Sequence, residues 1–243
     1  MQCAFFTFAA VISVYEMGAA FKKKGINIFL PPLYLFATAY FVLYRLFGNI
    51  ALYTLAVASL AALIGDRVFN KKRETDSVFY AFSILIYPLM LYVILMLLAE
   101  YNDYDISRIL LLSSFAMPLM GDMLAYFGGK LFGKRKLAPD ISPNKTVAGG
   151  IFGIVGGALG GYVVFLVQTF YPAGINMIAL ICLGAVCGTV GQIGDLFAST
   201  IKRWAGIKDF GKLFPGHGGV MDRLDSVLFC APIVLCVYMW IAL

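Results

Sequence analysis

Eight apolar runs, separated by short polar connections, make up most of the chain. Each run has the roughly 20 residues that a helix needs to cross a bilayer, and only Gly48 and Asn49 separate the second run from the third. The pattern predicts an all-α fold, a polytopic transmembrane helix bundle of about eight spans. The runs fall at about 3–21, 28–47, 48–65, 78–99, 106–128, 147–170, 174–198 and 224–243.

The composition also places the chain in the membrane class. Of its 243 residues, 61% are apolar and 13% are charged, whereas a soluble domain carries about 25% charged residues. The five cysteines lie within the apolar runs and have no ligand-like spacing. We therefore expect an integral membrane protein with the lipid bilayer as a partner, and we predict neither a zinc site nor a nucleic-acid partner.

Positive charge is concentrated in every second connection. The connections that follow the odd-numbered runs hold all but two of the 19 lysines and arginines, the exceptions being Arg45 and Arg108. Cytoplasmic loops of membrane proteins carry an excess of these residues. The asymmetry predicts cytoplasmic odd-numbered connections and external termini, in a multi-pass protein of the inner (plasma) membrane.

The polar residues suited to chemistry gather at the same predicted face. Asp122 lies near the cytoplasmic end of the fifth run, and Asp195 lies about one turn before the end of the seventh. The connection 129–146 ends in SPNKT, and residues 199–225 follow the seventh run. Ionisable groups within a span are costly and by default functional, so we predict one shared site at the cytoplasmic face. For each aspartate alone, the alternative is a carboxylate at a helix end that reaches water.

Residues 199–225 carry the densest set of charges. Five cations are interleaved there with three aspartates, beside the only histidine, His217, in the glycine-rich turn 216–219. Clustered carboxylates without cysteine suit Mg²⁺ better than zinc, and Asp222 and Asp225 stand three apart, on one helix face. Interleaved cations suit a metal-binding anion such as a nucleotide phosphate chain, whose oxygens glycine N–H groups can approach. A solvated connector is the alternative.

Glycines recur at every fourth position in the sixth apolar run. Such a stripe of small residues is typical of helices whose backbones approach closely. We interpret it as a packing surface rather than a binding site. It consists of Gly149, Gly153, Gly157 and Gly161.

Residues 199–225 also resemble a known signature. In the phosphatidate cytidylyltransferases, also called CDP-diacylglycerol synthases, it reads S-x-aliphatic-K-R, four residues, K-D, a loop of small residues, H-G-G and D-R-x-D. This chain fills the pattern without a gap. The matching residues are Ser199, Ile201, Lys202, Arg203, Lys208, Asp209, Gly211, Pro215, His217, Gly218, Gly219, Asp222, Arg223 and Asp225.

Shorter matches extend the resemblance over residues 120–243, whereas the first hundred residues match only in hydropathy. Ala148 stands where many relatives have an acidic residue, so no carboxylate role is carried over there. Relatives usually begin with an extra hydrophobic segment, so the chain is either a shorter variant or lacks a start. The residues that resemble the family's D-x-x-A-Y-F-x-G, S-P-x-K-T-x-x-G and G-D segments are Asp122, Ala125, Tyr126, Gly129, Ser142, Pro143, Lys145, Thr146, Gly149, Gly194 and Asp195.

The resemblance implies that cytidylyl passes from CTP to phosphatidate, forming CDP-diacylglycerol and pyrophosphate in phospholipid biosynthesis. It implies Mg²⁺ as cofactor, with a second cation and a homodimer left open. Catalysis is expected in residues 106–243, and residues 1–105 are expected to be N-terminal transmembrane helices of the same continuous bundle. The alternatives are a CTP-dependent lipid kinase, a CDP-ether-lipid synthase and, more distantly, an ion-coupled transporter.

Three groups of site residues follow from the resemblance. The expected metal ligands are Asp195, Asp222 and Asp225, with Asp122 and Asp209 as further candidates. Three more residues join these aspartates as catalytic candidates: Lys202, Arg223 and His217. The expected substrate-binding residues are Ser142, Lys145, Thr146, Ser199, Arg203, Lys208, Gly218 and Gly219.

Overall fold

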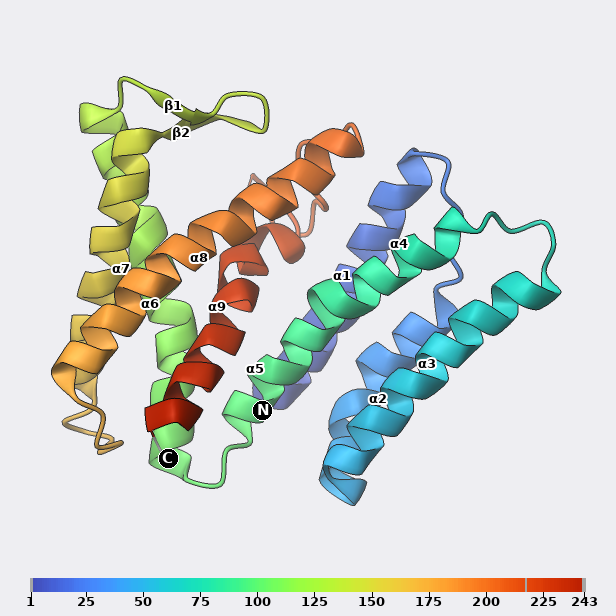
Figure 1. The fold of residues 1–243 in the computed structure, drawn as a ribbon, viewed down its shortest axis with the longest axis horizontal. Helices are drawn as coiled ribbons and strands as arrows, with labels where there is room; N and C mark the ends of the chain where they lie inside the picture. Colours follow the sequence, from blue (N-terminus) through green and yellow to red (C-terminus); the bar gives the residue numbers. More distant parts are fainter. Residues whose placement is uncertain (1, 217, 242–243) are drawn as a thin grey trace. The chain divides into compact units, whose positions relative to one another are not determined.

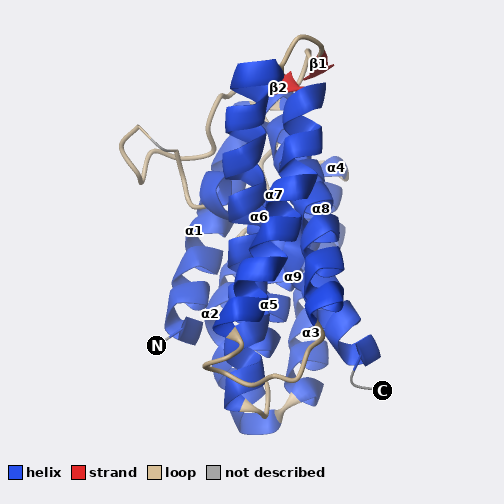
Figure 2. Cartoon of the chain, turned by 90° about the vertical axis from the view of Figure 1, so that its left-hand side faces the viewer, coloured by secondary structure: helices blue, strands red, loops and turns tan. Residues whose placement is uncertain are grey.

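The computed structural model describes residues 2–216 and 218–241, and this part of the chain is helical apart from one short hairpin (Figure 1, Figure 2). Segments α4, η1 and α5, of which η1 is π-helical, follow one another from Asp76 to Ala99. The helices are α1 (Gln2–Lys23), α2 (Pro31–Phe47), α3 (Asn49–Phe69), α4 (Asp76–Ile84), η1 (Leu85–Met90), α5 (Leu91–Ala99), α6 (Tyr104–Phe132), α7 (Val147–Val167), α8 (Met177–Trp204) and α9 (Met221–Ile241). The strands are β1 (Lys136–Ala138) and β2 (Ser142–Thr146).

The helices match the eight predicted apolar runs. In the described part of the chain, seven helical segments are long and apolar enough to cross a membrane. The remaining run, 28–47, corresponds to α2, which has 17 residues. The break between α2 and α3 lies at Gly48, whose φ of 68° is in the left-handed region that favours glycine. The predicted all-α, multi-span fold class is confirmed.

The chain forms two compact units. The first contains the residues up to Met96 together with Trp204–Arg223, and the second contains Leu97–Arg203 and the residues from Leu224 onward. The sequence predicted a functional division at residue 105, close to the first of these boundaries. It did not predict that part of the signature segment joins the N-terminal helices. Which part carries catalysis stays a prediction.

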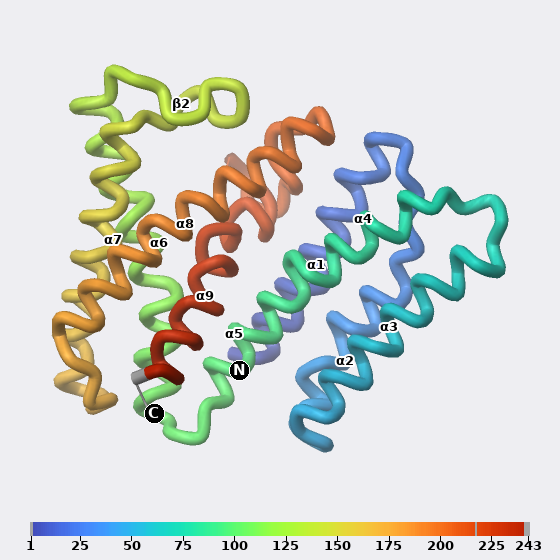
Figure 3. Tube along the Cα trace, viewed as in Figure 1, coloured from blue at the N-terminus to red at the C-terminus, as the bar shows by residue number. Residues whose placement is uncertain are grey.

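In the first unit, α1 packs against several other helical segments. It contacts α2, α4 and η1, while α2 and α3 lie side by side after the turn at Gly48 (Figure 3). The hydroxyl groups of Ser13 in α1 and Tyr92 in α5 are hydrogen-bonded, with 2.9 Å between their oxygens. The helix is thus held on several sides. The buried apolar residues of these helices include Val14 and Met17 in α1, Leu33 and Phe36 in α2, and Ile84 in α4.

Contacts within the first unit bring the ends of several basic connections together. The ring of Trp204, the last residue of α8, lies 5.8 Å from that of Phe21 in α1 and 5.3 Å from that of Tyr80 in α4. Arg73 Nη1 donates a hydrogen bond to the Asn27 carbonyl oxygen at 2.9 Å. These contacts link the connections after α1, α3 and α8. Because these helices correspond to the first, third and seventh predicted runs, all three connections are odd-numbered in the predicted topology.

In the second unit, glycines allow α7 to pack closely against α6 and α8. A Cβ on Gly149 would lie 2.7 Å from the Ala125 carbonyl oxygen in α6. A Cβ on Gly157 would overlap the Gly184 carbonyl oxygen in α8. The helices can approach this closely only because these positions carry no side chain, so the predicted packing role of the glycine stripe is confirmed.

The connection between α6 and α7, which the sequence treated as a loop, contains an antiparallel hairpin. Strands β1 and β2 pair, with Lys136 opposite Thr146. Thr146 caps α7, because its Oγ1 accepts a hydrogen bond from the Gly149 N–H at 3.1 Å and so satisfies a donor that the helix leaves unpaired. The hairpin and the cap fix the backbone that carries Lys145.

Candidate active site

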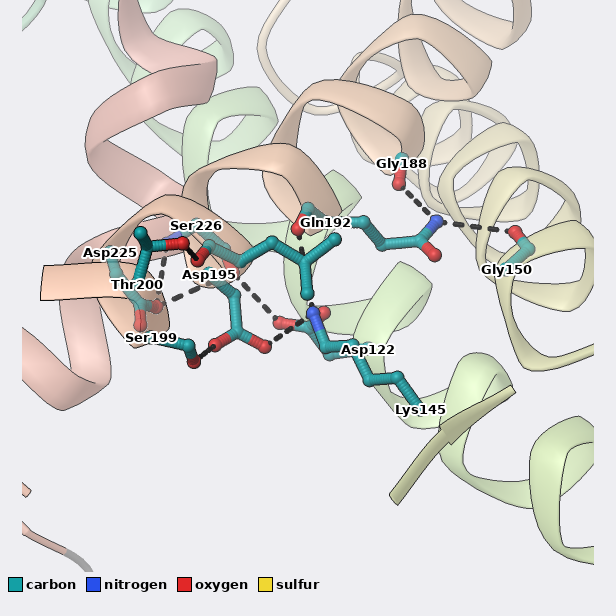
Figure 4. Close-up of polar contacts among 11 residues, drawn as sticks. Asp122, Lys145, Gly150, Gly188, Gln192, Asp195, Ser199, Thr200, Asp225 and Ser226 are labelled. Carbon is teal, nitrogen blue, oxygen red and sulfur yellow. Dashed lines mark hydrogen bonds and ion pairs between the residues drawn. The ribbon is translucent and has the colours of Figure 1, made fainter. Parts of the chain in front are cut away.

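Three of the predicted carboxylates lie together in the second unit. Asp122 comes from α6, Asp195 from α8 and Asp225 from the first turns of α9 (Figure 4). Asp225 is only 6% exposed, and its charge interacts with those of Asp195 and Asp122. Three helices therefore bring into one region three aspartates that are up to about a hundred positions apart in the sequence.

Ser226 connects two of these carboxylates. Its hydroxyl donates a hydrogen bond to Asp122 Oδ2 at 3.2 Å and lies 3.5 Å from Asp225 Oδ1. Its backbone N–H donates to Asp225 Oδ1 at 2.7 Å. Buried carboxylates require such donors. The sequence analysis missed Ser226, and its position directly after the last signature aspartate was the one available signal.

Lys145 supplies a positive charge beside Asp195 (Figure 4). Its Nζ lies 2.6 Å from Asp195 Oδ2 and donates a hydrogen bond to the Gln192 carbonyl oxygen at 3.4 Å. The Ser199 hydroxyl, one turn further along α8, donates to Asp195 Oδ1 at 3.3 Å. Both oxygens of Asp195 thus have a partner, and both partners were predicted as substrate-binding residues.

The close approach of α8 and α9 explains why a glycine precedes Asp195. A Cβ on Gly194 would lie 2.8 Å from Phe229 Cδ2 and 2.9 Å from the Asp225 carbonyl oxygen. A larger residue at this position would therefore push α9 away from α8. The missing side chain allows the two helices to present Asp195 and Asp225 to the same region.

The cluster contains charges of both signs. Lys202 is buried, at 7% exposure, and interacts electrostatically with Asp225, as Lys145 does with Asp122. Carboxylate oxygens are the ligands that Mg²⁺ prefers, so the donor chemistry fits the predicted cation. Within residues 2–216 and 218–241, however, no group of three or more acidic, histidine or cysteine side chains is arranged to hold a metal ion. Metal binding here stays a prediction.

In the first unit, Asp222 organises the loop that precedes α9. Its Oδ2 accepts hydrogen bonds from the backbone N–H groups of Phe210, at 2.8 Å, and Gly219, at 2.9 Å. Gly218 has a φ of 84°, and a Cβ there would lie 2.8 Å from Asp222 Oδ2. The Gly219 N–H, predicted to contact phosphate, therefore donates to Asp222. The predicted metal role of Asp222 is not tested by these contacts.

The other predicted residues lie at several places. Arg203 Nε donates a hydrogen bond to the Ile141 carbonyl oxygen, in the hairpin turn, at 3.2 Å, and Ser142 begins β2. His217 lies outside the described residues. We call the loop between α8 and α9, residues 205–220, the signature loop. Its predicted residues Lys208 and Asp209 are exposed, as is Arg223 in the first turn of α9.

The sequence analysis also missed Glu16 in α1. This glutamate is 2% exposed and accepts hydrogen bonds from the backbone N–H groups of Val220 and Met221, at 3.0 and 2.9 Å. It is the one acidic residue of the first apolar run. Ionisable residues within spans are by default functional, so the position of Glu16 in an apolar run was the available signal.

Comparison with known proteins assigns the family. The model of the cytidylyltransferase family matches residues 1–241, so the match includes both units and the whole carboxylate cluster. This chain belongs to the cytidylyltransferase family. The resemblance seen in the signature segment is thereby confirmed and extends over the N-terminal helices as well.

Several curated relatives of this cytidylyltransferase-family chain carry the name phosphatidate cytidylyltransferase. One from Aquifex aeolicus is 40% identical over 177 residues, which are 73% of this chain and 63% of that protein. One from Staphylococcus epidermidis is 41% identical over 124 residues, or 51% and 46% of the two chains. One from Rickettsia prowazekii is 34% identical over 162 residues, or 65% and 69%. The chain thus spans about half to two thirds of the length of these relatives.

Proposed function

We propose that this protein transfers the cytidylyl group of CTP to phosphatidate, forming CDP-diacylglycerol and pyrophosphate in phospholipid biosynthesis. The observation that carries the proposal is the convergence of Asp122, Asp195 and Asp225 with Lys145 among apolar helices, in a chain of the cytidylyltransferase family. The names of the curated relatives support the same pair of substrates.

The chemistry of the substrates defines what the site has to do. The second pKa of a phosphate monoester is about 6, so the phosphate of phosphatidate is largely ionised at neutral pH and can attack without a general base. Both substrates are anions that repel each other. The protein therefore has to hold them in line and neutralise the charge that develops on the pyrophosphate. We accordingly assign His217 to positioning rather than proton transfer.

The cationic side chains of the cluster suit this task. We assign Lys145 to the phosphate chain of CTP, because its ammonium group lies in the cluster, 2.6 Å from Asp195 Oδ2. Lys202 contributes a second positive charge beside Asp225. One or two of the carboxylates Asp122, Asp195 and Asp225, together with phosphate oxygens of CTP, would hold Mg²⁺, which when bound supplies charge neutralisation at the phosphate chain.

We assign the site to the cytoplasmic face of the inner membrane, where CTP is available and the acyl chains of the lipid can stay in the bilayer. The distribution of lysine and arginine supports this orientation. Contacts between odd-numbered connections, from Arg73 to Asn27 in the first unit and from Arg203 to Ile141 in the second, are consistent with these connections sharing one side of the membrane.

The phosphorus that is attacked distinguishes the proposed reaction from its nearest alternative. Purified protein in lipid–detergent micelles would be given phosphatidate, Mg²⁺ and CTP labelled at the α-phosphorus. We expect label in the organic phase and an equal amount of released pyrophosphate. Label that stays in water as CDP, together with a newly phosphorylated lipid, would establish a CTP-dependent lipid kinase instead. Activity confined to an ether-linked lipid phosphate would establish a CDP-ether-lipid synthase.

A further inference from the structure

The carboxylate of Glu16 is buried in a position where a charge needs specific partners. It lies in the apolar helix α1 and is 2% exposed, between the buried residues Val14 and Met17. Moving an ionised carboxylate out of water is costly unless hydrogen bonds replace its hydration. The partners of Glu16 therefore indicate what this residue does.

Those partners are two backbone N–H groups at the start of α9. Glu16 Oε1 accepts from Val220, directly before the helix, at 3.0 Å, and Oε2 accepts from Met221, its first residue, at 2.9 Å. The N–H groups at the start of a helix have no acceptor within the helix, and a negative charge there is also favoured by the helix dipole. One side chain of α1 thus satisfies two donors at the start of α9, in the same unit.

Two glycines of the signature loop leave space for this carboxylate. A Cβ on Gly211 would overlap Glu16 Oε1, and a Cβ on Gly219 would overlap the same carboxylate group. The Cβ on Gly211 would also lie 3.1 Å from Gly219 Cα. Gly211, Gly219 and the two N–H groups therefore form a notch around Glu16, and we call it the Glu16 notch.

The Glu16 notch adjoins the residue that organises the signature loop. Asp222 follows Met221 directly and accepts hydrogen bonds from Phe210 and Gly219. Glu16 and Asp222 thus hold the same short backbone segment, Gly219–Met221, through different N–H groups. A shift of this segment would move Asp222 with it.

We infer that Glu16 is a positioning residue: it holds the start of α9 and the signature loop in the place from which Asp222 acts. The effect of Glu16 on turnover rests on the proposed function. Its hold on the backbone at Val220 and Met221 does not, and the two can be measured separately.

The first test is Glu16→Gln, which keeps the shape of the side chain but removes its charge and one of its two acceptors. We expect the amides of Val220 and Met221 to exchange hydrogen about tenfold faster or more, because each loses a hydrogen bond to a charged group. We expect kcat with CTP and phosphatidate to fall about ten- to a hundredfold, with little change in the KM for phosphatidate. Glu74→Gln, at an exposed glutamate, is the matched control and should change neither quantity.

The outcomes separate the possible failures. Unchanged amide exchange at Val220 and Met221 would overturn the inference. Faster exchange with normal kcat per folded molecule would also overturn it, because Glu16 would then have only a structural role. A wild-type protein that transfers no cytidylyl, but whose exchange responds to Glu16→Gln, would overturn the proposed function and leave the hold of Glu16 on α9 supported.

A second test uses the Glu16 notch and does not depend on one variant folding well. Gly211→Ala should lower kcat in the wild-type background, since the added Cβ collides with Glu16. In a Glu16→Ala background the collision is absent, so Gly211→Ala should have a clearly smaller effect. Residues in contact show such non-additivity, whereas independent ones do not. Additive effects of the two substitutions would contradict the contact between position 211 and Glu16 that defines the notch.

Discussion

Each buried or half-buried carboxylate of the cluster depends on a small number of identified partners. Asp195 is held by Lys145 and Ser199, and Asp225 by Ser226. An uncompensated buried charge is costly. When one partner is substituted, the main effect should therefore come from the carboxylate that has lost that partner. At the scale of single residues, function can therefore be tested by substitutions that delete one charge and keep the size of the side chain.

We predict that Lys145→Gln lowers kcat/KM for CTP by about 10²-fold or more, the scale of losing one strong electrostatic contact in the transition state. The substitution removes the charge that lies 2.6 Å from Asp195. Steady-state kinetics of the purified protein at saturating phosphatidate would measure the effect. Lys134→Gln, at an exposed lysine of the same connection, is the control and should stay near wild type. Equal activity of the two variants would show that Lys145 does not take part in binding or turnover of CTP.

Asp222→Asn separates charge from loop organisation at the start of α9. An asparagine oxygen can still accept the N–H groups of Phe210 and Gly219, so we expect the protein to stay folded. If Asp222 also binds Mg²⁺, turnover should fall about 10²-fold or more, and extra Mg²⁺ should restore only part of it. Activity would be titrated against Mg²⁺ for this variant and for Asp140→Asn, an exposed control. Wild-type turnover would show that no metal ligand lies here.

At the scale of elements, close backbone packing determines where the cluster forms. In the second unit α7 lies against α6 and α8 through glycines, and α8 approaches α9 at Gly194. The hairpin β1–β2 then leads Lys145 to the start of α7. The catalytic candidates are therefore positioned by helices whose backbones come close to one another at glycines.

We predict that Gly157→Ala destabilises the protein by about 1–3 kcal/mol, the usual cost of overpacking. The added methyl group would overlap the Gly184 carbonyl oxygen of α8, and backbone cannot rotate away as a side chain can. Gly65→Ala in α3 is the matched control. No atom lies within 4 Å of its added Cβ, and alanine is the better helix former, so stability there should be unchanged or slightly higher. Thermal unfolding in detergent would measure both, and equal effects would contradict the packing argument.

At the scale of the whole molecule, the chain changes unit more than once along its length. It leaves the first unit after Met96, returns at Trp204 and leaves again after Arg223. The signature segment is thus divided, with Ser199, Lys202 and Asp225 in the second unit and the loop before α9 in the first. Apolar helices of both units have exposed faces, for example at Ile50 and Tyr162, as a protein surrounded by lipid requires.

Topology belongs to this scale, and the distribution of cations predicts it. In a background without native cysteines, a cysteine at Asn102 should react with a membrane-impermeant reagent added from outside, because the connection between α5 and α6 is predicted to be external. A cysteine at Lys212, in the signature loop, should react only after the membrane is permeabilised. Both positions are exposed, so accessibility in the folded protein is matched. The reverse labelling pattern would contradict the orientation and the cytoplasmic site.

What the sequence determined by itself was local. Apolar runs of sufficient length predict helices wherever they occur, the break at Gly48 follows from the conformational freedom of glycine, and the stripe containing Gly157 predicts close packing without naming the partner helix. The distribution of charge also predicted that Asp122, Asp195 and residues 199–225 share one face of the membrane, because all of them lie on the same predicted side.

The tertiary structure alone decided which groups are paired. Glu16 meets N–H groups that are 204 and 205 positions away, and no local pattern specifies a partner at that separation. Ser226 joins two carboxylates from different helices, and Gly219 gives its N–H to Asp222 although its motif suggested a phosphate contact. A hydrogen bond requires its donor and acceptor atoms to be at the correct distance to within a few tenths of an ångström. That distance is set by how the helices pack against one another, and not by the sequence pattern within any one helix.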